Sequence, residues 1–328
     1  MKTKAKTKTI DKRNQKTGIA TAVSGHRWLV RAVAFALVLV SVLPVVPGHA
    51  ATIAVDSTAD TPGGADCNLR DAIQAATFDG PVAGCTAGSG ADIIDMSAIA
   101  GGTIMLSGGA LELFGDTNVD SEIAIQGSGV TIDANSNHRV MEIRVINATL
   151  DNLQLVNGDA NSAPVMDGGC LSVSRYSEVT VRGSAISNCR AMNGAGIYGK
   201  NAILNIADTT ITEKSADQFG GGIYLTKSTL SMSNSVVSGN KAGTEGGGLM
   251  TDDKLTFSNV TIDTNSAQFG GGLSVHGGPA SVLSSTVSNN NASVDGGGMW
   301  FVGGITTISS STLTNNTADN EGGGCLLY

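Results

Sequence analysis

The chain has 328 residues, of which 44 are Gly, 15% are charged and 41% are hydrophobic. This length supports a sizeable core, the low charge argues against a disordered chain, and the lack of a three-residue Gly period excludes collagen. Residues 51–328 hold 11 basic and 27 acidic residues, a net charge of −16. Nucleic acid and anionic membrane surfaces are therefore unsuitable partners, because both need a cationic surface.

Residues 1–50 have the order of a secretory signal peptide. Nine basic residues precede an apolar run at 32–46, and Pro47, Gly48 and Ala50 follow it. Small residues at these places predict cleavage between Ala50 and Ala51. The alternative is an uncleaved membrane anchor, but the run is short for a span of about 20 residues. We therefore expect an exported protein, extracellular or on a bacterial outer-membrane surface, with no transmembrane helix in the mature chain.

Residues 51–91 contain the one convincing helix, at 68–77. Asn68 can serve as its N-cap, and an apolar face repeats along it. Cys67 and Cys85 enclose a short loop, and we predict a disulfide between them, since export allows disulfides. The pairing of Cys170, Cys189 and Cys325 stays open. The repeats that follow this segment, described next, predict a solenoid, and the first coil of a solenoid needs to be covered. We therefore expect residues 51–91 to cap the fold.

The C-terminal half is a repeat of about 26 residues. The last residues of the Gly clusters are spaced by 24 to 27 residues, at Gly169, Gly196, Gly222, Gly248, Gly272, Gly298 and Gly324. An apolar residue follows each of them, beginning with Cys170 and Ile197. A second register has the same period, at Ile186, Ile211, Val237, Ile262, Val287 and Leu313. Two registers with one period predict stacked repeats.

The period and composition predict a right-handed parallel β-helix over 92–328. Each repeat holds short β-branched runs of alternating polarity, whereas helix formers are sparse and a propeller blade needs about 40 residues. Two or three strands per coil suit 26 residues, and 92–168 fits less regular coils. Asn240, Asn265, Asn290 and Asn316 recur at one position. We expect them to form a ladder of side-chain amides between coils.

Residues 67–76, Cys-Asn-Leu-Arg-Asp-Ala-Ile-Gln-Ala-Ala, resemble the CSLREA motif that opens secreted bacterial β-helix proteins. The chain departs from the motif at Asn68 and Asp71. The repeats, Gly-Gly-Gly followed by Ile or Leu and then Ser-x-Asn, are similar to those of polymorphic outer-membrane proteins, with an aliphatic residue where an aromatic one is usual. The resemblance covers 52–328. It implies export and a β-helical fold, and it implies no catalytic residue.

The chain stops at Tyr328, just after a Gly cluster, where a new strand is expected. This position predicts a C-terminal truncation. The alternative is a natural end whose open edge pairs with another subunit, because an uncovered last coil favours self-association.

Two enzyme classes can be weighed on named residues. A glycoside hydrolase needs paired carboxylates, and Asp252-Asp253 is the one adjacent acidic pair. Neighbouring strand residues point to opposite faces, so we expect this pair in a solvated turn. His276 is expected in a turn as well. Asp295 and Glu321 lie on neighbouring coils and could share a Ca²⁺ as a cofactor. Five arginines of the early coils could contact an acidic glycan: Arg139, Arg144, Arg175, Arg182 and Arg190.

Aromatic residues suggest a binding surface instead. Tyr198, Tyr224 and Trp300 occupy the second position after a Gly cluster and are expected to point outward, as an exposed ladder for sugar rings or a protein partner. The alternative is ordinary packing between coils. We therefore expect a non-catalytic secreted or cell-surface scaffold for adhesion or binding to a glycan or a host or cell-surface protein. The competing function is a polysaccharide lyase or glycoside hydrolase acting on acidic polysaccharide.

Overall fold

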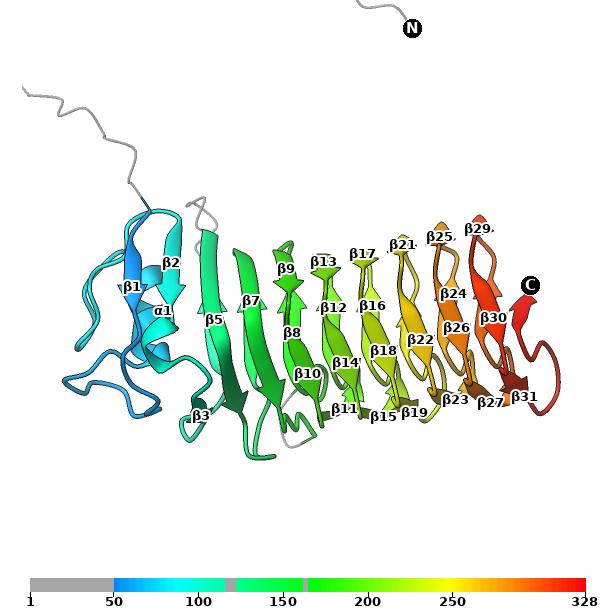
Figure 1. Cartoon of the computed structure of the whole chain (residues 1–328), viewed down its shortest axis with the longest axis horizontal. Coiled ribbons are helices and arrows are strands. Elements are labelled where there is room, and N and C mark those ends of the chain that lie inside the picture. Colours follow the sequence, from blue (N-terminus) through cyan, green and yellow to red (C-terminus); the bar gives the residue numbers. More distant parts are fainter. Residues whose placement is uncertain (1–49, 116–121, 162–164) are drawn as a thin grey trace, which may run out of the picture. The chain divides into compact units, whose positions relative to one another are not determined.

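A computed structural model describes residues 50–115, 122–161 and 165–328. The predicted signal peptide lies outside these residues except for Ala50. From Ala51 onward the described chain winds into a stack of coils whose strands pair in parallel, from β1 with β2 to β28 with β32 (Figure 1). The protein is a parallel β-helix, as the repeat predicted. One α-helix, α1 (Leu69–Thr77), and a short 3₁₀ helix, η1 (Ser97–Ile99), accompany the strands in the described part.

The strands form three sheets, and a regular coil such as 197–219 supplies two strands to the first sheet and one to each of the others. The 17-stranded sheet contains β1 (Thr52–Ala54), β2 (Asp92–Asp95), β3 (Thr103–Met105), β5 (Glu122–Asp133), β7 (Asn147–Val156), β9 (Glu178–Arg182), β10 (Ala185–Ser187), β13 (Ile203–Ala207), β14 (Thr210–Thr212), β17 (Thr229–Ser233), β18 (Val236–Ser238), β21 (Leu255–Ser258), β22 (Thr261–Asp263), β25 (Ala280–Leu283), β26 (Thr286–Ser288), β29 (Thr306–Ser309) and β30 (Thr312–Thr314). The nine-stranded sheet contains β4 (Leu111–Phe114), β6 (Met141–Arg144), β8 (Leu171–Ser174), β12 (Ile197–Lys200), β16 (Ile223–Thr226), β20 (Leu249–Thr251), β24 (Leu273–His276), β28 (Met299–Val302) and β32 (Cys325–Leu327). The six-stranded sheet contains β11 (Arg190–Asn193), β15 (Ser215–Phe219), β19 (Lys241–Ala242), β23 (Ser266–Phe269), β27 (Asn291–Asp295) and β31 (Thr317–Ala318).

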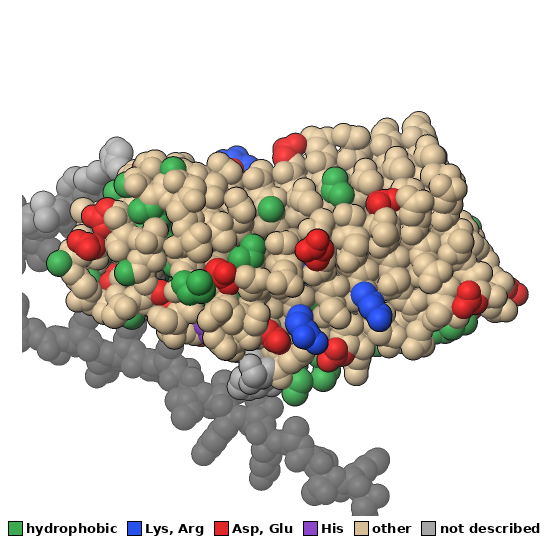
Figure 2. All heavy atoms as spheres, turned by 60° about the horizontal axis from the view of Figure 1, so that its bottom comes forward, with side chains coloured by type: hydrophobic (Ala, Val, Ile, Leu, Met, Phe, Trp, Pro, Cys, Tyr) green, Lys and Arg blue, Asp and Glu red, His purple; other side chains and the backbone are tan. Residues whose placement is uncertain are grey.

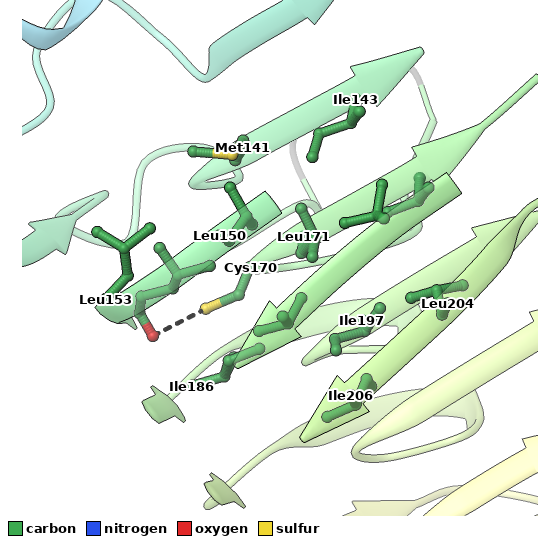
Figure 3. Close-up of a cluster of buried hydrophobic side chains, with 14 of the residues drawn as sticks. Met141, Ile143, Leu150, Leu153, Cys170, Leu171, Ile186, Ile197, Leu204 and Ile206 are labelled. Atoms are coloured by element: carbon green, nitrogen blue, oxygen red, sulfur yellow. Dashed lines mark hydrogen bonds between the residues drawn. The ribbon is translucent and has the colours of Figure 1, made fainter. Parts of the chain in front are cut away.

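The core consists of apolar columns that run through the stack. Ile197 pairs with Leu171 on one side (Figure 3) and with Ile223 on the other, and all three side chains are fully buried. The column through Ile186 and Ile211 continues in the same way. Burial of each such side chain contributes about 1.5–3 kcal/mol, so the columns provide most of the hydrophobic stabilisation. One expectation was wrong by one residue: Leu171, not Cys170, is the partner of Ile197, and Cys170 lies beside Gly196.

The asparagine column forms a ladder inside the fold. Asn265 is 1% exposed, and its amide nitrogen donates to the Asn290 carbonyl oxygen at 3.0 Å and to the backbone oxygen of Val237. Its own carbonyl oxygen accepts from the backbone and amide nitrogens of Asn240, both at 2.9 Å. Asn290 repeats the pattern with Asn316. The ladder satisfies buried backbone groups that would otherwise destabilise the turns.

The cap residues 51–91 hold α1 over the first coils through polar contacts. The Asn68 side chain accepts from the backbone nitrogen of Asp71 at 3.0 Å, which makes it the N-cap. Arg70 pairs with Asp60 at 2.9 Å and donates to the backbone oxygens of Gly109 and Ala110. This arginine therefore ties α1 to the loop before β4.

Two disulfides are present, Cys67–Cys85 in the cap and Cys170–Cys189 at the first regular coils, and Cys325 is free. The second pair had been left open by the sequence. Among the described residues, no helix is long and apolar enough to span a membrane. The last coil leaves Ile305, Leu327 and Tyr328 well exposed, and self-association through it stays a prediction.

Candidate functional site

The Gly clusters make the corner that builds the candidate site. Gly220 has a left-handed φ of 58°, and a Cβ there would lie 2.7 Å from the Cβ of Tyr224. A Cβ on Gly221 would lie 2.3 Å from the backbone oxygen of Gly247 in the next coil. Only glycine tolerates both constraints. The chain therefore folds back tightly, and the residue before each cluster lies close to the outward side of the nine-stranded sheet.

Two columns of side chains meet at this corner, and we call them together the lateral face. The column before the Gly clusters contains Asp167, Asn193, Phe219, Glu245, Phe269, Asp295 and Glu321. The column on the nine-stranded sheet contains Ser172, Tyr198, Tyr224, Met250, Ser274, Trp300 and Leu326. From Phe219 to Asp295, aromatic rings and carboxylates alternate in the first column.

The aromatic side chains form two clusters. In the first, the ring centroids of Tyr198 and Tyr224 lie 5.9 Å apart, and those of Phe219 and Tyr224 lie 5.7 Å apart. In the second, Phe269 stacks on Trp300 at 4.8 Å, and the His276 ring meets Trp300 edge-on at 5.1 Å. These separations are those of favourable ring pairs.

The expected exposed ladder is not what the corner produces. Tyr198 is only 8% exposed and lies against the Tyr224 ring, while Tyr224 and Trp300 are partly exposed. Burial raises the pKa of Tyr198, and the Asp167 carboxylate and Tyr224 add to this. The pKa of Tyr224 is raised by burial and then by Asp252, Asp167 and Glu245. Both phenols therefore stay neutral hydrogen-bond donors at physiological pH.

Glu245, Ser274 and His276 lie between the two clusters. His276 ends β24 rather than lying in a turn, and its Nε2 lies 2.9 Å from Glu245 Oε2 and 3.3 Å from Ser274 Oγ. A nucleophilic triad needs the carboxylate and the hydroxyl on opposite ring nitrogens. Here one nitrogen contacts both groups, and Ser274 is fully buried. These contacts hold the Glu245 carboxylate and the His276 ring in fixed orientations, and their geometry does not fit acyl transfer.

Asp252 and Asp253 lie in the turn between β20 and β21, as expected. Asp252 accepts from the hydroxyl of Thr226 at 2.9 Å and from the backbone nitrogen of Lys227. Asp253 accepts from the backbone nitrogen of Ser228 at 2.9 Å. Burial and the neighbouring Asp252 raise the pKa of Asp253. Both carboxylates thus accept hydrogen bonds from the end of β16 or the turn that follows it in the preceding coil.

Asp295 and Glu321 are neighbours in the stack, but Asp295 Oδ1 is engaged. It accepts from the backbone nitrogen of Glu321 at 3.0 Å and from the amide of Asn320 at 2.8 Å. Ca²⁺ takes about six to eight oxygens. Across the part of the chain that the structure describes, no group of three or more His, Cys, Asp or Glu could hold a metal ion. The pair alone is a poor calcium site, and calcium binding stays a prediction.

The five arginines of the early coils do not act as one surface. Arg139 pairs with Glu142 at 2.8 Å and is 7% exposed, Arg144 lies 3.3 Å from the same carboxylate, and Arg182 pairs with Asp151 at 2.9 Å. Arg175 and Arg190 are exposed. Three of the five are thus neutralised by acidic neighbours.

The sequence analysis did not predict that Phe219 and Phe269 belong to the lateral face, and it expected His276 in a turn rather than beside Glu245. The repeated Gln-Phe-Gly at 218–220 and 268–270 was the available signal for the two phenylalanines. Its meaning depends on the left-handed glycine that follows. On the face shown in Figure 2, acidic, basic and hydrophobic side chains are scattered among backbone atoms and other side chains.

Comparison of this chain with protein-family models, with curated proteins and with solved structures finds no match.

Proposed function

We propose that the protein is an exported, non-catalytic β-helix scaffold that binds a glycan through the lateral face. The observation that carries the proposal is the pair of aromatic clusters flanked by carboxylates on successive coils. Partly exposed Tyr224 and Trp300 offer ring surface for sugars, and the partly exposed Asp167 and Glu245 accept hydrogen bonds from hydroxyl groups. Carboxylates at this density repel anions, so the ligand is a neutral glycan.

The dimensions of the lateral face support an extended ligand. Tyr224 and Trp300 are three coils apart, roughly 14 Å at about 4.8 Å per coil. The two disulfides and the resemblance of residues 67–76 to the CSLREA motif support export, extracellular or at a bacterial outer-membrane surface. A protein partner on a host or cell surface is an outcome of the same test.

Trp300 is the only tryptophan after residue 50, so its fluorescence reports on the lateral face. The protein, purified after export, is titrated with a panel of neutral oligosaccharides. We expect a saturable change in Trp300 emission and a loss of affinity of up to about tenfold in Tyr224→Ala, since a stacked ring contributes about 0.5–1.5 kcal/mol. Tyr176→Ala, a ring outside the lateral face, is the matched control and should bind normally.

The enzyme alternative is tested in the same samples. Reducing ends and unsaturated products are measured after incubation with neutral and acidic polysaccharides. Product formation that disappears in Asp252→Asn or Asp253→Asn would establish a polysaccharide lyase or hydrolase and overturn the scaffold proposal. If no oligosaccharide changes the fluorescence and the protein binds only a cell-surface protein, that protein and not a glycan is the ligand.

A further inference from the structure

Four exposed cations lie at one corner of four successive coils, where the nine-stranded sheet leads into the 17-stranded sheet. They are Arg175, Lys200, Lys227 and Lys254. Ser174 pairs with Lys200 and Lys200 with Thr226, so Lys200 lies one register position before Arg175 and Lys227 of the adjoining coils. Within the described ranges none of the four forms an ion pair, whereas Arg70, Arg139, Arg144 and Arg182 all do. An unpaired basic row stands out on a domain of net charge −16.

A cavity of about 360 Å³ opens at this corner. Its lining includes Lys227 and Lys254 from the basic row, together with Tyr176, Asn201, Ile203 and Asp253. These residues come from four consecutive coils. The cavity therefore combines two cations, an aromatic ring, an amide and a carboxylate, and it shares no residue with the lateral face.

Tyr176 is held in an unfavourable state at the cavity. Its φ is 68°, that of Arg175 is 61°, and the tyrosine is 87% exposed. A bulky residue in the left-handed region is strained, and an exposed ring gains little from packing in return. Its backbone nitrogen donates to the oxygen of Asn201 at 2.6 Å, which fixes the turn. Strain of this kind, at a cavity, points to a ring positioned for a ligand.

We propose that this corner cavity binds a carboxylated sugar, a uronate unit of an acidic glycan. Lys227 and Lys254 pair with the carboxylate, Tyr176 provides the surface for the sugar ring, and Asn201 and Asp253 bond to ring hydroxyls. A dense polyanion such as nucleic acid is disfavoured, because the acidic remainder of the domain repels it. The site stands independently of the neutral-glycan site on the lateral face.

The experiment is a calorimetric titration of the protein, purified after export, with a short oligogalacturonate. We expect saturable binding that weakens with salt, and no binding of the uncharged methyl ester of the same oligosaccharide. Lys227→Gln and Lys254→Gln should each weaken binding by about tenfold, the value for a lost charge-assisted hydrogen bond. Lys241→Gln makes the same charge change on the six-stranded sheet and should leave the affinity unchanged.

Tyr176→Gly separates a ligand-binding role from a structural one. We expect a higher melting temperature, because glycine relieves the left-handed backbone, together with weaker binding. A lower melting temperature with full affinity would show that the ring is structural. Tyr224→Ala should bind the oligogalacturonate normally, which distinguishes this site from the lateral face.

Four results would overturn the proposal. They are no heat of binding at millimolar oligogalacturonate, equal binding of the methyl ester, an equal loss in Lys241→Gln, or full competition by inorganic phosphate at the same concentration. An equal loss in Lys241→Gln would indicate general attraction of anions to the protein. Full competition by phosphate would indicate a simple anion site without recognition of the sugar.

Discussion

At the residue scale, the first described residues place a buried carboxylate beside a predicted cleavage point. Asp92 is 1% exposed, its Oδ1 accepts from the backbone nitrogen of Ala51 at 3.2 Å, and its Oδ2 has no partner in the described part of the chain. Burial raises the pKa of Asp92, and the nearby Asp79 adds to the shift. Cleavage between Ala50 and Ala51 would turn that backbone nitrogen into an ammonium group. The cut would then supply the missing positive partner.

We therefore expect Asp92→Asn to have opposite effects before and after the cut. In the exported protein with a free Ala51 amine, the variant should lower stability by about 1 kcal/mol, because an ion pair is lost. After acetylation of that amine, the variant should be more stable than the parent, because a buried charge is removed. Melting temperatures at neutral pH measure both, and the same sign in both forms would contradict the ion pair.

The pH dependence of stability should also differ in sign between the acetylated and the free-amine protein. With a raised pKa, the folded state binds more protons than the unfolded state, so the acetylated parent loses stability as pH rises above 3.8, the ordinary value for Asp. With the ammonium present, the ionised carboxylate has a charged partner in the folded state, so we expect stability to rise with pH over the same range. Asp92→Asn removes either slope and serves as the reference.

At the element scale, the asparagine ladder stops at a lysine. Lys214 occupies the ladder position one coil before Asn240, is 2% exposed, and donates from Nζ to the backbone oxygen of Thr212 at 2.6 Å. Burial lowers the pKa of Lys214 well below its ordinary value, against a smaller opposing effect of Glu213. The ladder is thus interrupted by a group that is costly to charge.

We expect Lys214→Asn to extend the ladder and to stabilise the fold by about 1 kcal/mol at neutral pH. Because the lowered pKa makes the folded parent bind fewer protons than the unfolded chain, the parent gains stability as pH rises toward 10.5. The advantage of the variant should therefore shrink over that range. Chemical denaturation at two pH values measures the effect, with Lys241→Asn on the surface as the control. A destabilised Lys214→Asn would show that the lysine stem is needed for packing.

At the scale of the whole molecule, each coil contacts only its neighbours, as in other solenoids. The corner glycines allow the backbones of neighbouring coils to approach closely. A Cβ on Gly247 would lie 2.4 Å from the backbone oxygens of both Gly271 and Ser266. The clash therefore involves the next coil and not distant ones.

Gly247→Ala should therefore raise hydrogen exchange in the adjacent coils, around 220–275, and leave the cap and the last coil near their parental rates. The expected cost is a few kcal/mol locally, since backbone atoms must move. Exchange measured by mass spectrometry resolves the coils. Gly277→Ala, where an added Cβ meets nothing within 4 Å, controls for the substitution but carries its own strain at φ 73°. Uniformly faster exchange along the whole stack would contradict nearest-neighbour stability.

The sequence by itself determined the coil period, the apolar columns, the asparagine ladder positions, the capping helix and the Cys67–Cys85 pair. Each depends on spacing along the chain, and a period of about 26 residues decides which residues stack. Only the tertiary structure decided how the columns meet across a corner. Phe219 lies against Tyr224, Tyr198 is buried, His276 reaches Glu245 one coil away, and Cys170 lies outside its expected column and pairs with Cys189. Turn geometry sets such contacts, and a one-residue change in a turn redirects a side chain without altering the period.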